Sequence, residues 1–290
     1  MKPASFEYHR VFTADEAVTL LAELDDEAKV LAGGQSLAPM MNFRLARPSA
    51  LVDINPVGEL DYVRRDGDVL KIGALTRHRT IELLDDPSII DGYGVLPSAA
   101  RHIGHFPIRT RGTVGGSIAH SDPSAEWCLL ALLLDAQIVT LGPQGRRETA
   151  ARDWFTGFLT TSIEPGEIVV ETAFPRPRAR AALTEYAQRK GDFAICSAAV
   201  AYDDADGVMS DPAIVLGGVA SEPFRSSELD EIASGLPAEP SSFTRIARAA
   251  ADLIDPPSDL HGDSAYRKDL AQTMIERAFA EAADGPVSAR

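Results

Sequence analysis

Cysteine is nearly absent from this sequence, which has only Cys128 and Cys196 among its 290 residues. Four-cysteine zinc sites and all-cysteine iron–sulfur sites each need four thiolates, and a disulfide framework needs several cysteine pairs. The chain therefore holds no such cluster of its own, and any redox chemistry needs another carrier. We expect both cysteines to be buried as small hydrophobic side chains.

Long hydrophobic runs are also missing. The longest, residues 127–134, is far shorter than the roughly 20 residues that a membrane-spanning helix needs. The first residues, MKPASFEYHRVF, contain no apolar stretch followed by a small-residue cleavage site, so they do not resemble a secretory signal. These absences predict a soluble, cytoplasmic protein without a membrane span.

Basic residues are outnumbered by acidic ones, 28 against 43, and the formal net charge is −15. A field of that sign repels phosphate backbones, so we expect no nucleic-acid partner. The remaining composition, with 45% hydrophobic and 24% charged residues, is typical of globular proteins. A chain of this length is long enough to form one or two hydrophobic cores.

Local signals near the N-terminus predict several elements. Thr13 and Glu16 have the spacing of a capping box and indicate the start of an amphipathic helix. Residues 29–32 have the pattern of a short strand that leads directly into a glycine pair. Further along, Asp66 and Gly67 are typical of the turn of a β-hairpin.

The middle of the chain contains a stretch, residues 105–126, that is poor in bulky apolar residues and rich in glycine, hydroxyl groups and charge. This composition predicts a functional loop. Asp122 and Pro123 at its end have the pattern of an N-cap and a first helical residue, so they predict a helix that runs through residues 127–134.

A linker is predicted at Pro175–Arg180, where two prolines alternate with arginines. Beyond it, strand-like segments precede two helical segments, residues 241–254 and 264–283, and this order is typical of an α+β domain. We therefore divide the chain into two domains, residues 1–176 and 177–290.

Two glycine loops carry the main chemical signal, one at Ala32–Leu37 and one at Thr113–Ser117. Each has adjacent glycines with a serine within two residues, so each is expected to present bare backbone N–H groups and one hydroxyl to an anion such as a pyrophosphate. Neither loop matches the Rossmann or P-loop motif. Either loop alone also fits a plain turn, but the two together favour an unusual dinucleotide site.

Five runs of sequence resemble one protein family, the FAD-binding medium subunits of molybdenum hydroxylases. That family includes the medium chains of aerobic carbon monoxide dehydrogenase and of bacterial nicotine, caffeine and xanthine dehydrogenases. The resemblance extends from about Phe6 to Arg277. The runs are AGGQSLAPMMNFRLARPSALVDIN (32–55), IGALTRHRTIE (72–82), HIGHFPIRTRGTVGGSIAHSDPSAEW (102–127), KGDFA (190–194) and LGGVASEPFR (216–225).

The resemblance implies an α+β fold whose first domain is an FAD-binding domain of the vanillyl-alcohol oxidase (PCMH) type. This domain would have two subdomains, at about 1–56 and 57–176. A smaller C-terminal α+β domain of the carbon monoxide dehydrogenase flavoprotein type would follow.

The function implied is that of an FAD-carrying electron-transfer subunit in a heterotrimeric molybdenum hydroxylase. A large partner would hold molybdopterin and oxidise the substrate, and a small partner with two [2Fe–2S] clusters would deliver electrons to FAD on this chain. An external acceptor would then take them. The complex would be a dimer of heterotrimers.

The resemblance also assigns cofactor-binding residues. The two glycine loops would hold the pyrophosphate and ribityl region of FAD, an acidic residue would lie near its adenosine part, and an aromatic residue would lie beside the isoalloxazine. The residues are Ala32, Gly33, Gly34, Gln35, Ser36, Leu37, Ile108, Thr113, Gly115, Gly116, Ser117, His120, Glu126, Asp192 and Phe193.

Two positions depart from the family pattern. Gln35 stands where many relatives have histidine, and Ser117 stands where many have asparagine or aspartate. Both replacements keep hydrogen-bonding capacity. Because no histidine occurs in Ala32–Leu37, we expect FAD to be bound noncovalently.

Some alternatives stay open at this point. A self-sufficient flavin oxidase of the same fold is one, and a binding module that has lost its flavin is another. His102 and His105 have helical spacing, but no further ligand lies close in sequence to complete a zinc site. Arg109 and Arg111 receive no role. We assign no catalytic residue and no metal site to this chain, and the substrate is left open.

Overall fold

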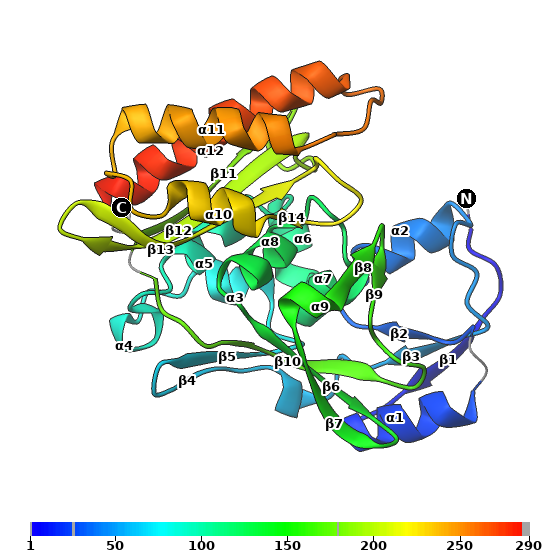
Figure 1. Ribbon diagram of the computed structural model, residues 1–290. Coiled ribbons are helices and arrows are strands. Elements are labelled where there is room, and N and C mark those ends of the chain that lie inside the picture. The colour runs from blue at the N-terminus through cyan, green and yellow to red at the C-terminus, as the bar shows by residue number, and fades with distance from the viewer. Residues whose placement is uncertain (1, 25–26, 179, 286–290) are drawn as a thin grey trace.

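Three β-sheets and one short hairpin organise the residues that the computed structural model describes, which are 2–24, 27–178 and 180–285 (Figure 1). A three-stranded parallel sheet comes first in the chain, a five-stranded antiparallel sheet follows, and a four-stranded antiparallel sheet belongs to the last part. Helices lie between and over them. This mixture of helices and sheets confirms the α+β class. The last residues of the predicted C-terminal domain, 286–290, lie outside the described residues.

The parallel sheet has the strand order β1-β3-β2. Its strands are β1 (Glu7–Arg10), β2 (Lys29–Leu31) and β3 (Ala50–Asp53). Helix α1 (Ala14–Glu23) begins at the predicted capping box, in which the N–H of Glu16 donates to Thr13 Oγ1 at 3.1 Å and the N–H of Thr13 donates to the Glu16 carboxylate at 3.3 Å. Strand β2 runs into the first glycine loop, as predicted, and helix α2 (Leu37–Asn42) follows the loop.

The five-stranded sheet has the order β4-β5-β10-β6-β7. Its strands are β4 (Val63–Asp66), β5 (Val69–Gly73), β6 (Gln137–Gly142), β7 (Gly145–Ala150) and β10 (Ile168–Phe174). The predicted hairpin turn joins β4 and β5, with Gly67 at φ +60°. Shorter elements connect these strands, namely η1 (Gly58–Leu60), α3 (His78–Glu82), α4 (Pro87–Ile90), α5 (Val95–Ala100), α9 (Ala151–Trp154) and the hairpin β8 (Phe155–Gly157) and β9 (Thr160–Thr161).

The stretch 105–126 is not the open loop that its composition predicts. Most of it folds into two short helices, α6 (Phe106–Arg111) and α7 (Val114–His120). Thr113 caps α7, because its side chain accepts a hydrogen bond from the N–H of Gly116 at 3.1 Å. Helices this short depend on tertiary packing, so composition alone is a poor guide to them.

Helix α8 (Glu126–Leu133) begins later than predicted, at Glu126 rather than at Pro123. The predicted N-cap, Asp122, stabilises a turn before the helix instead. Its carboxylate accepts from the N–H of Ser124 at 2.8 Å, and its carbonyl accepts from the N–H of Ala125 at 2.9 Å. A short turn therefore separates the C-terminal end of α7 from the start of α8.

The last part of the chain follows the predicted order of strands and then helices. Its sheet has the order β11-β12-β13-β14. The elements are β11 (Arg180–Tyr186), β12 (Cys196–Ala205), β13 (Val208–Gly217), β14 (Phe224–Arg225), α10 (Ser227–Ala233), α11 (Pro240–Leu253) and α12 (Ser264–Asp284). Residues 208–217 form one long strand, β13. The register shifts near Asp211, which has φ +45°, and such an irregularity lets a strand carry Pro212.

Helix α8 joins the two predicted domains through a common core. All its residues from Trp127 to Leu133 are buried. They pack in one hydrophobic cluster with Leu70 and Ile72 of β5 and with Val215 of β13. The opposite face of the C-terminal sheet packs against α10, α11 and α12 in a second cluster. The C-terminal sheet is therefore buried on both faces.

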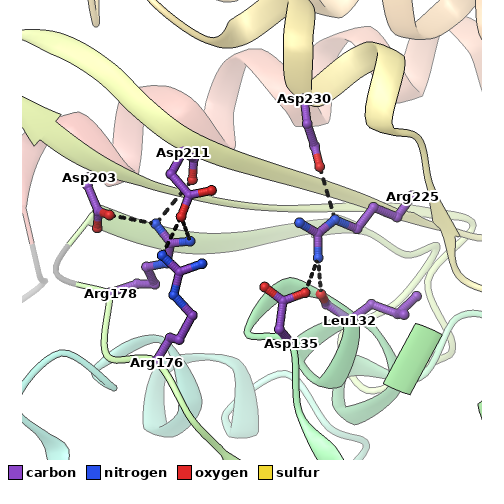
Figure 2. A network of polar contacts seen from close by, with 8 residues as sticks. All are labelled: Leu132, Asp135, Arg176, Arg178, Asp203, Asp211, Arg225 and Asp230. Atoms are coloured by element: carbon purple, nitrogen blue, oxygen red, sulfur yellow. Dashed lines mark hydrogen bonds and ion pairs between the residues drawn. The ribbon is translucent and has the colours of Figure 1, made fainter. Parts of the chain in front are cut away.

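The predicted linker is irregular from residue 175 to residue 178, whereas Ala179 lies outside the described residues and Arg180 already belongs to β11. Figure 2 shows that Arg176 and Arg178 are bound to the C-terminal sheet. The buried guanidinium of Arg178 donates to the Asp211 carboxylate at 2.7 Å and pairs with Asp203 at 3.0 Å. Arg176 also pairs with Asp211. The linker is thus held against the sheet rather than free.

A second arginine cluster, around Arg225, lies at the boundary between the two domains (Figure 2). Arg225 of β14 donates to the Leu132 carbonyl of α8 at 2.6 Å and to Asp135 at 2.8 Å. Its Nε donates to Asp230 of α10 at 3.1 Å. One guanidinium therefore connects the end of the buried helix α8 to two elements of the C-terminal domain.

Both cysteines are buried and free, as expected. Burial raises the pKa of the Cys128 thiol well above its usual value and raises the pKa of Cys196 to about 12. Neither thiol is therefore ionised near neutral pH. Among the described residues, no helix is long and apolar enough to cross a membrane.

The Arg225 cluster yields a stability prediction. Arg225→Met removes the partner of two carboxylates and one carbonyl at the domain interface, so we expect the free energy of unfolding to fall by about 1–3 kcal/mol. Arg176→Met is the matched control. Its partner Asp211 keeps Arg178 and is half exposed, so the loss should stay below about 1 kcal/mol. Urea denaturation measures both, and equal losses would contradict the assigned role of Arg225.

Candidate functional site

The first glycine loop, Ala32–Leu37, presents unused backbone donors. None of the five N–H groups from Gly33 to Leu37 has a hydrogen-bond acceptor within the described part of the chain. Gly34 has φ +69°, a left-handed conformation that favours glycine. Gly33 is buried, and a buried N–H without an acceptor is costly. The loop is therefore suited to an acceptor from outside the chain, as its sequence predicts.

The second glycine loop behaves differently. The four N–H groups from Val114 to Ser117 all donate within the protein, so the expectation of bare amides is wrong for them. Their acceptors are Thr76 O (3.0 Å), Ala74 O (2.9 Å), Thr113 Oγ1 (3.1 Å) and Thr113 O (3.0 Å), in chain order. Close packing explains the glycine at 115, because a Cβ there would lie 2.7 Å from the Cα of Ala74.

The two glycine loops lie side by side in the structure. A Cβ on Gly33 would lie 2.7 Å from the Cα of Gly112 and would overlap the carbonyl oxygen of Arg111. The first loop therefore rests on the residues that directly precede the second one. This contact brings together the two segments that the sequence singles out.

Two residues that the sequence interpretation missed connect these loops. Asn55, just beyond β3, donates from Nδ2 to the carbonyl of Ala32 at 2.7 Å. Arg77, just before α3, donates to Asn55 Oδ1 at 2.8 Å and to the carbonyl of Arg111. Both lie within sequence runs that resemble the family. Only their positions beside the end of a strand and the start of a helix could have indicated them.

The C-terminal domain reaches the same region through the loop between β11 and β12. A Cβ on Gly191 would overlap the ring of His105, which directly precedes α6. Helix α6 therefore has the first glycine loop at its C-terminal end and the 187–195 loop at its N-terminal end, about 9 Å apart at 1.5 Å per residue. Phe193 of this loop is 66% exposed, and Asp192 beside it is also exposed.

The predicted residue Ile108 and two residues without an assigned role, Arg109 and His102, lie on or near α6. Ile108 is within it, and its carbonyl accepts from the N–H of Gly112 at 2.7 Å. Arg109 donates to Glu82 at 2.8 Å and to the carbonyl of Gly104 at 2.8 Å, so its guanidinium holds the helix in place. His102 pairs with Glu185 of β11 at 3.4 Å.

Glu126, at the start of α8, is an unusual carboxyl group. Burial, with a smaller effect of the negative charge of Glu185, raises its pKa to about 8. It therefore carries a proton at neutral pH. His120 ends α7, and burial lowers the pKa of its imidazole.

A neutral histidine, His78, packs against Gly112 and so supports the site. Burial, followed by the charges of Arg77 and Arg109, lowers the pKa of His78 to about 3. Its Nδ1 accepts from the indole N–H of Trp127 at 2.9 Å. A Cβ on Gly112 would lie 2.6 Å from Nε2 of the same ring. The imidazole thus fills the space directly behind the segment on which the first loop rests.

Comparison with known proteins agrees with this geometry. Residues 4–177 match the family described as FAD binding domain in molybdopterin dehydrogenase, and residues 181–282 match the CO dehydrogenase flavoprotein C-terminal domain. The subunit alpha of the 6-hydroxypseudooxynicotine dehydrogenase complex of Paenarthrobacter nicotinovorans is 39% identical, over 97% of this chain and 96% of the relative. The carbon monoxide dehydrogenase medium chain of Hydrogenophaga pseudoflava is 36% identical, over 96% and 97%. The chain belongs to the FAD-binding medium subunits of molybdenum hydroxylases.

A solved structure shows that the likeness extends to the whole fold of this medium subunit. In carbon monoxide dehydrogenase from Hydrogenophaga pseudoflava, solved without the Mo-pyranopterin moiety of its cofactor, one chain superposes with a TM-score of 0.93 at 35% identity. The match covers 98% of this chain and 99% of that one. The expected family, with its FAD-binding and C-terminal domains, is therefore confirmed.

The residues of this medium subunit fit the cofactor of its family. The diphosphate of FAD is an anion, and the first glycine loop offers five N–H groups that no described part of the chain uses. Of the other residues that the sequence singles out, Ser117 lies on α7, Glu126 begins α8, and the ring of Phe193 is exposed. The structure therefore has the backbone donors that such a ligand needs.

The pKa of Glu126 yields a pH prediction. Its carboxyl ionises near pH 4.5 in the unfolded chain and near 8 in the folded, FAD-free chain, so stability falls as pH rises between these values. Glu126→Gln cannot ionise. The stability gained by this variant should be near zero below about pH 4 and should grow until about pH 8. Denaturation at a series of pH values tests this, with the exposed Glu231→Gln as control, and a gain independent of pH would contradict it.

Proposed function

We propose that this medium subunit binds one FAD noncovalently and that Ala32, Gly33, Gly34, Gln35, Ser36 and Leu37 hold its pyrophosphate. The observation that carries this proposal is the run of five N–H groups from Gly33 to Leu37 that find no acceptor among the residues that the structure describes. These N–H groups act at short range, whereas the repulsion from distant carboxylates, which give the chain its net charge of −15, is screened over about 8 Å at physiological salt. Local donors therefore outweigh the unfavourable net charge.

The second glycine loop has a different role in this proposal. Its amides are used internally, so Thr113, Gly115 and Gly116 shape the wall of the site through close packing, and the hydroxyl of Ser117 is the group left to bind FAD. The other residues assigned by resemblance keep their proposed places around the cofactor. They are Ile108, His120, Glu126, Asp192 and Phe193.

Electron transfer is the proposed activity of the subunit. Bound FAD supplies two-electron redox chemistry, and the protein supplies binding, orientation and electrostatics. We propose that electrons arrive from the [2Fe–2S] clusters of a small subunit and leave to an external acceptor, while the substrate is oxidised at molybdopterin in a large subunit. The names of the relatives, a dehydrogenase complex subunit and a medium chain, support a multi-subunit assembly.

We further propose a cytoplasmic dimer of heterotrimers for the complete enzyme. The substrate would be selected in the large subunit, so no residue of this chain is assigned to substrate recognition. A self-sufficient flavin oxidase is the less favoured alternative, because such enzymes usually carry a substantial substrate-cap domain. Residues 181–282 match the carbon monoxide dehydrogenase flavoprotein C-terminal domain instead.

The FAD site is tested by changing one glycine and a matched control. Valine at position 34 would be strained at φ +69° and would block close approach to the loop, so Gly34→Val should weaken FAD binding by at least about 100-fold. Gly67→Val introduces the same side chain at φ +60° in the β4–β5 turn, where a Cβ meets no other atom. It should lose comparable stability and still bind FAD. Equilibrium dialysis with FAD measures both, and unchanged binding by Gly34→Val would refute the site.

The state of the flavin gives an independent test of the same proposal. Acid denaturation of the FAD-loaded chain should release all flavin into the supernatant, because no covalent link is proposed. The purified chain should also contain no stoichiometric iron. Flavin that precipitates with the protein would contradict noncovalent binding, and stoichiometric iron would contradict the assignment of the clusters to a partner.

A further inference from the structure

We propose that Asn55 and Arg77 are positioning residues that aim a backbone N–H of the first glycine loop at the cofactor. This inference rests on the proposed FAD site. Asn55 and Arg77 do not supply the N–H donors themselves. Asn55 bonds the carbonyl of Ala32, and Arg77 bonds Asn55. Two hydrogen bonds lead from Arg77 through Asn55 to the carbonyl of Ala32, and a third joins Arg77 to the carbonyl of Arg111.

The carbonyl of Ala32 and the N–H of Gly33 belong to one peptide unit. In a planar trans peptide these two groups point in opposite directions. Asn55 Nδ2 donates to this carbonyl at 2.7 Å, so it sets the plane of the unit and directs the Gly33 N–H away from Asn55. That N–H is the buried donor without a described acceptor. Asn55 therefore orients a donor that it does not touch.

Arg77 determines which way the Asn55 amide faces. A guanidinium has only donors, so the amide oxygen must face Arg77 and the amide nitrogen must face Ala32. The observed bond from Arg77 to Asn55 Oδ1, at 2.8 Å, has this polarity. The second bond of Arg77, to the carbonyl of Arg111, attaches Asn55 to the segment on which Gly33 rests.

Asn55 is held from the other side as well. The carboxylate of Asp53 accepts from its backbone N–H at 2.9 Å and from Nδ2 at 2.6 Å. Burial alone would raise the pKa of Asp53, but hydrogen bonds from Tyr8 and Asn55 outweigh this effect and lower it. The acceptor is therefore ionised near neutral pH, and charge-assisted hydrogen bonds of this kind are the stronger ones.

Gln35 provides the same orientation for the next peptide unit. Its Nε2 donates to the carbonyl of Gly33 at 3.0 Å, which sets the direction of the Gly34 N–H. The two side-chain amides thus orient consecutive donors. Asn55 thus supports the loop from outside, and Gln35 supports it from within.

The test measures FAD affinity in the full chain for Asn55→Ala, Arg77→Met and the double variant, with Arg64→Met as control. Arg64 is an exposed arginine that pairs with Glu171. Each single variant should weaken FAD binding roughly tenfold, and Arg64→Met should not. Because Arg77 acts through Asn55, the FAD affinity of the double variant should be no lower than that of the single variant with the lower affinity.

Two further measurements separate positioning from general stability. The melting temperature of the FAD-free chain should fall more in Asn55→Ala than in Arg64→Met, because Asn55→Ala leaves the partners of several hydrogen bonds unpaired. FAD affinity is therefore measured at a temperature at which every variant is folded. The ³¹P resonances of bound FAD at saturation should shift in Asn55→Ala and in Arg77→Met, and they should stay at the wild-type position in Arg64→Met. Lower melting temperatures with unchanged affinity and unchanged ³¹P resonances would overturn the positioning role.

The outcome also distinguishes this inference from the proposed function. A wild-type chain that binds no FAD would overturn both. A wild-type chain that binds FAD, together with Asn55→Ala and Arg77→Met variants that bind it equally well, would overturn the inference and leave the FAD site intact.

Discussion

The candidate site depends on one close backbone contact, between Gly33 and the segment Arg111–Gly112. A Cβ on Gly33 would overlap the Arg111 carbonyl, so the approach is possible only for glycine. The contact joins the end of the parallel sheet to the helices that precede α8. Arg77 and Asn55 bridge the same gap with hydrogen bonds, and the His78 ring fills the space behind it.

The two glycine loops look alike in sequence but have opposite hydrogen-bonding states. In the first loop the chain leaves its N–H groups without described acceptors, whereas in the second loop Thr113 and the residues after β5 accept all four. One loop can therefore donate to a ligand, and the other forms a rigid wall. This asymmetry also explains how a chain with a net charge of −15 can present a site for a diphosphate. A few oriented dipoles at short range outweigh distant, screened charges.

The C-terminal domain contributes to the site because it is packed firmly on the first domain. The buried helix α8 belongs to a core that includes residues of both domains, and Arg176 and Arg225 each bind a partner across the interface (Figure 2). The loop that carries Phe193 is consequently placed beside α6 by the tertiary fold. The match to medium subunits along nearly the whole chain is consistent with the two domains acting as one functional unit.

Sequence by itself determined the features that depend on neighbouring residues. The Thr13 capping box, the turn at Gly67 and the two long helices α11 and α12 follow from local spacing, and the glycine pairs carried the family resemblance. Short helices such as α6 and α7 escaped this reasoning, since packing rather than local propensity stabilises them. Only the tertiary structure decided which amides are free and which residues orient them. Asn55 and Arg77 reach partners 23 and 34 positions away, and hydrogen bonds between such distant residues leave no periodic signal in the chain.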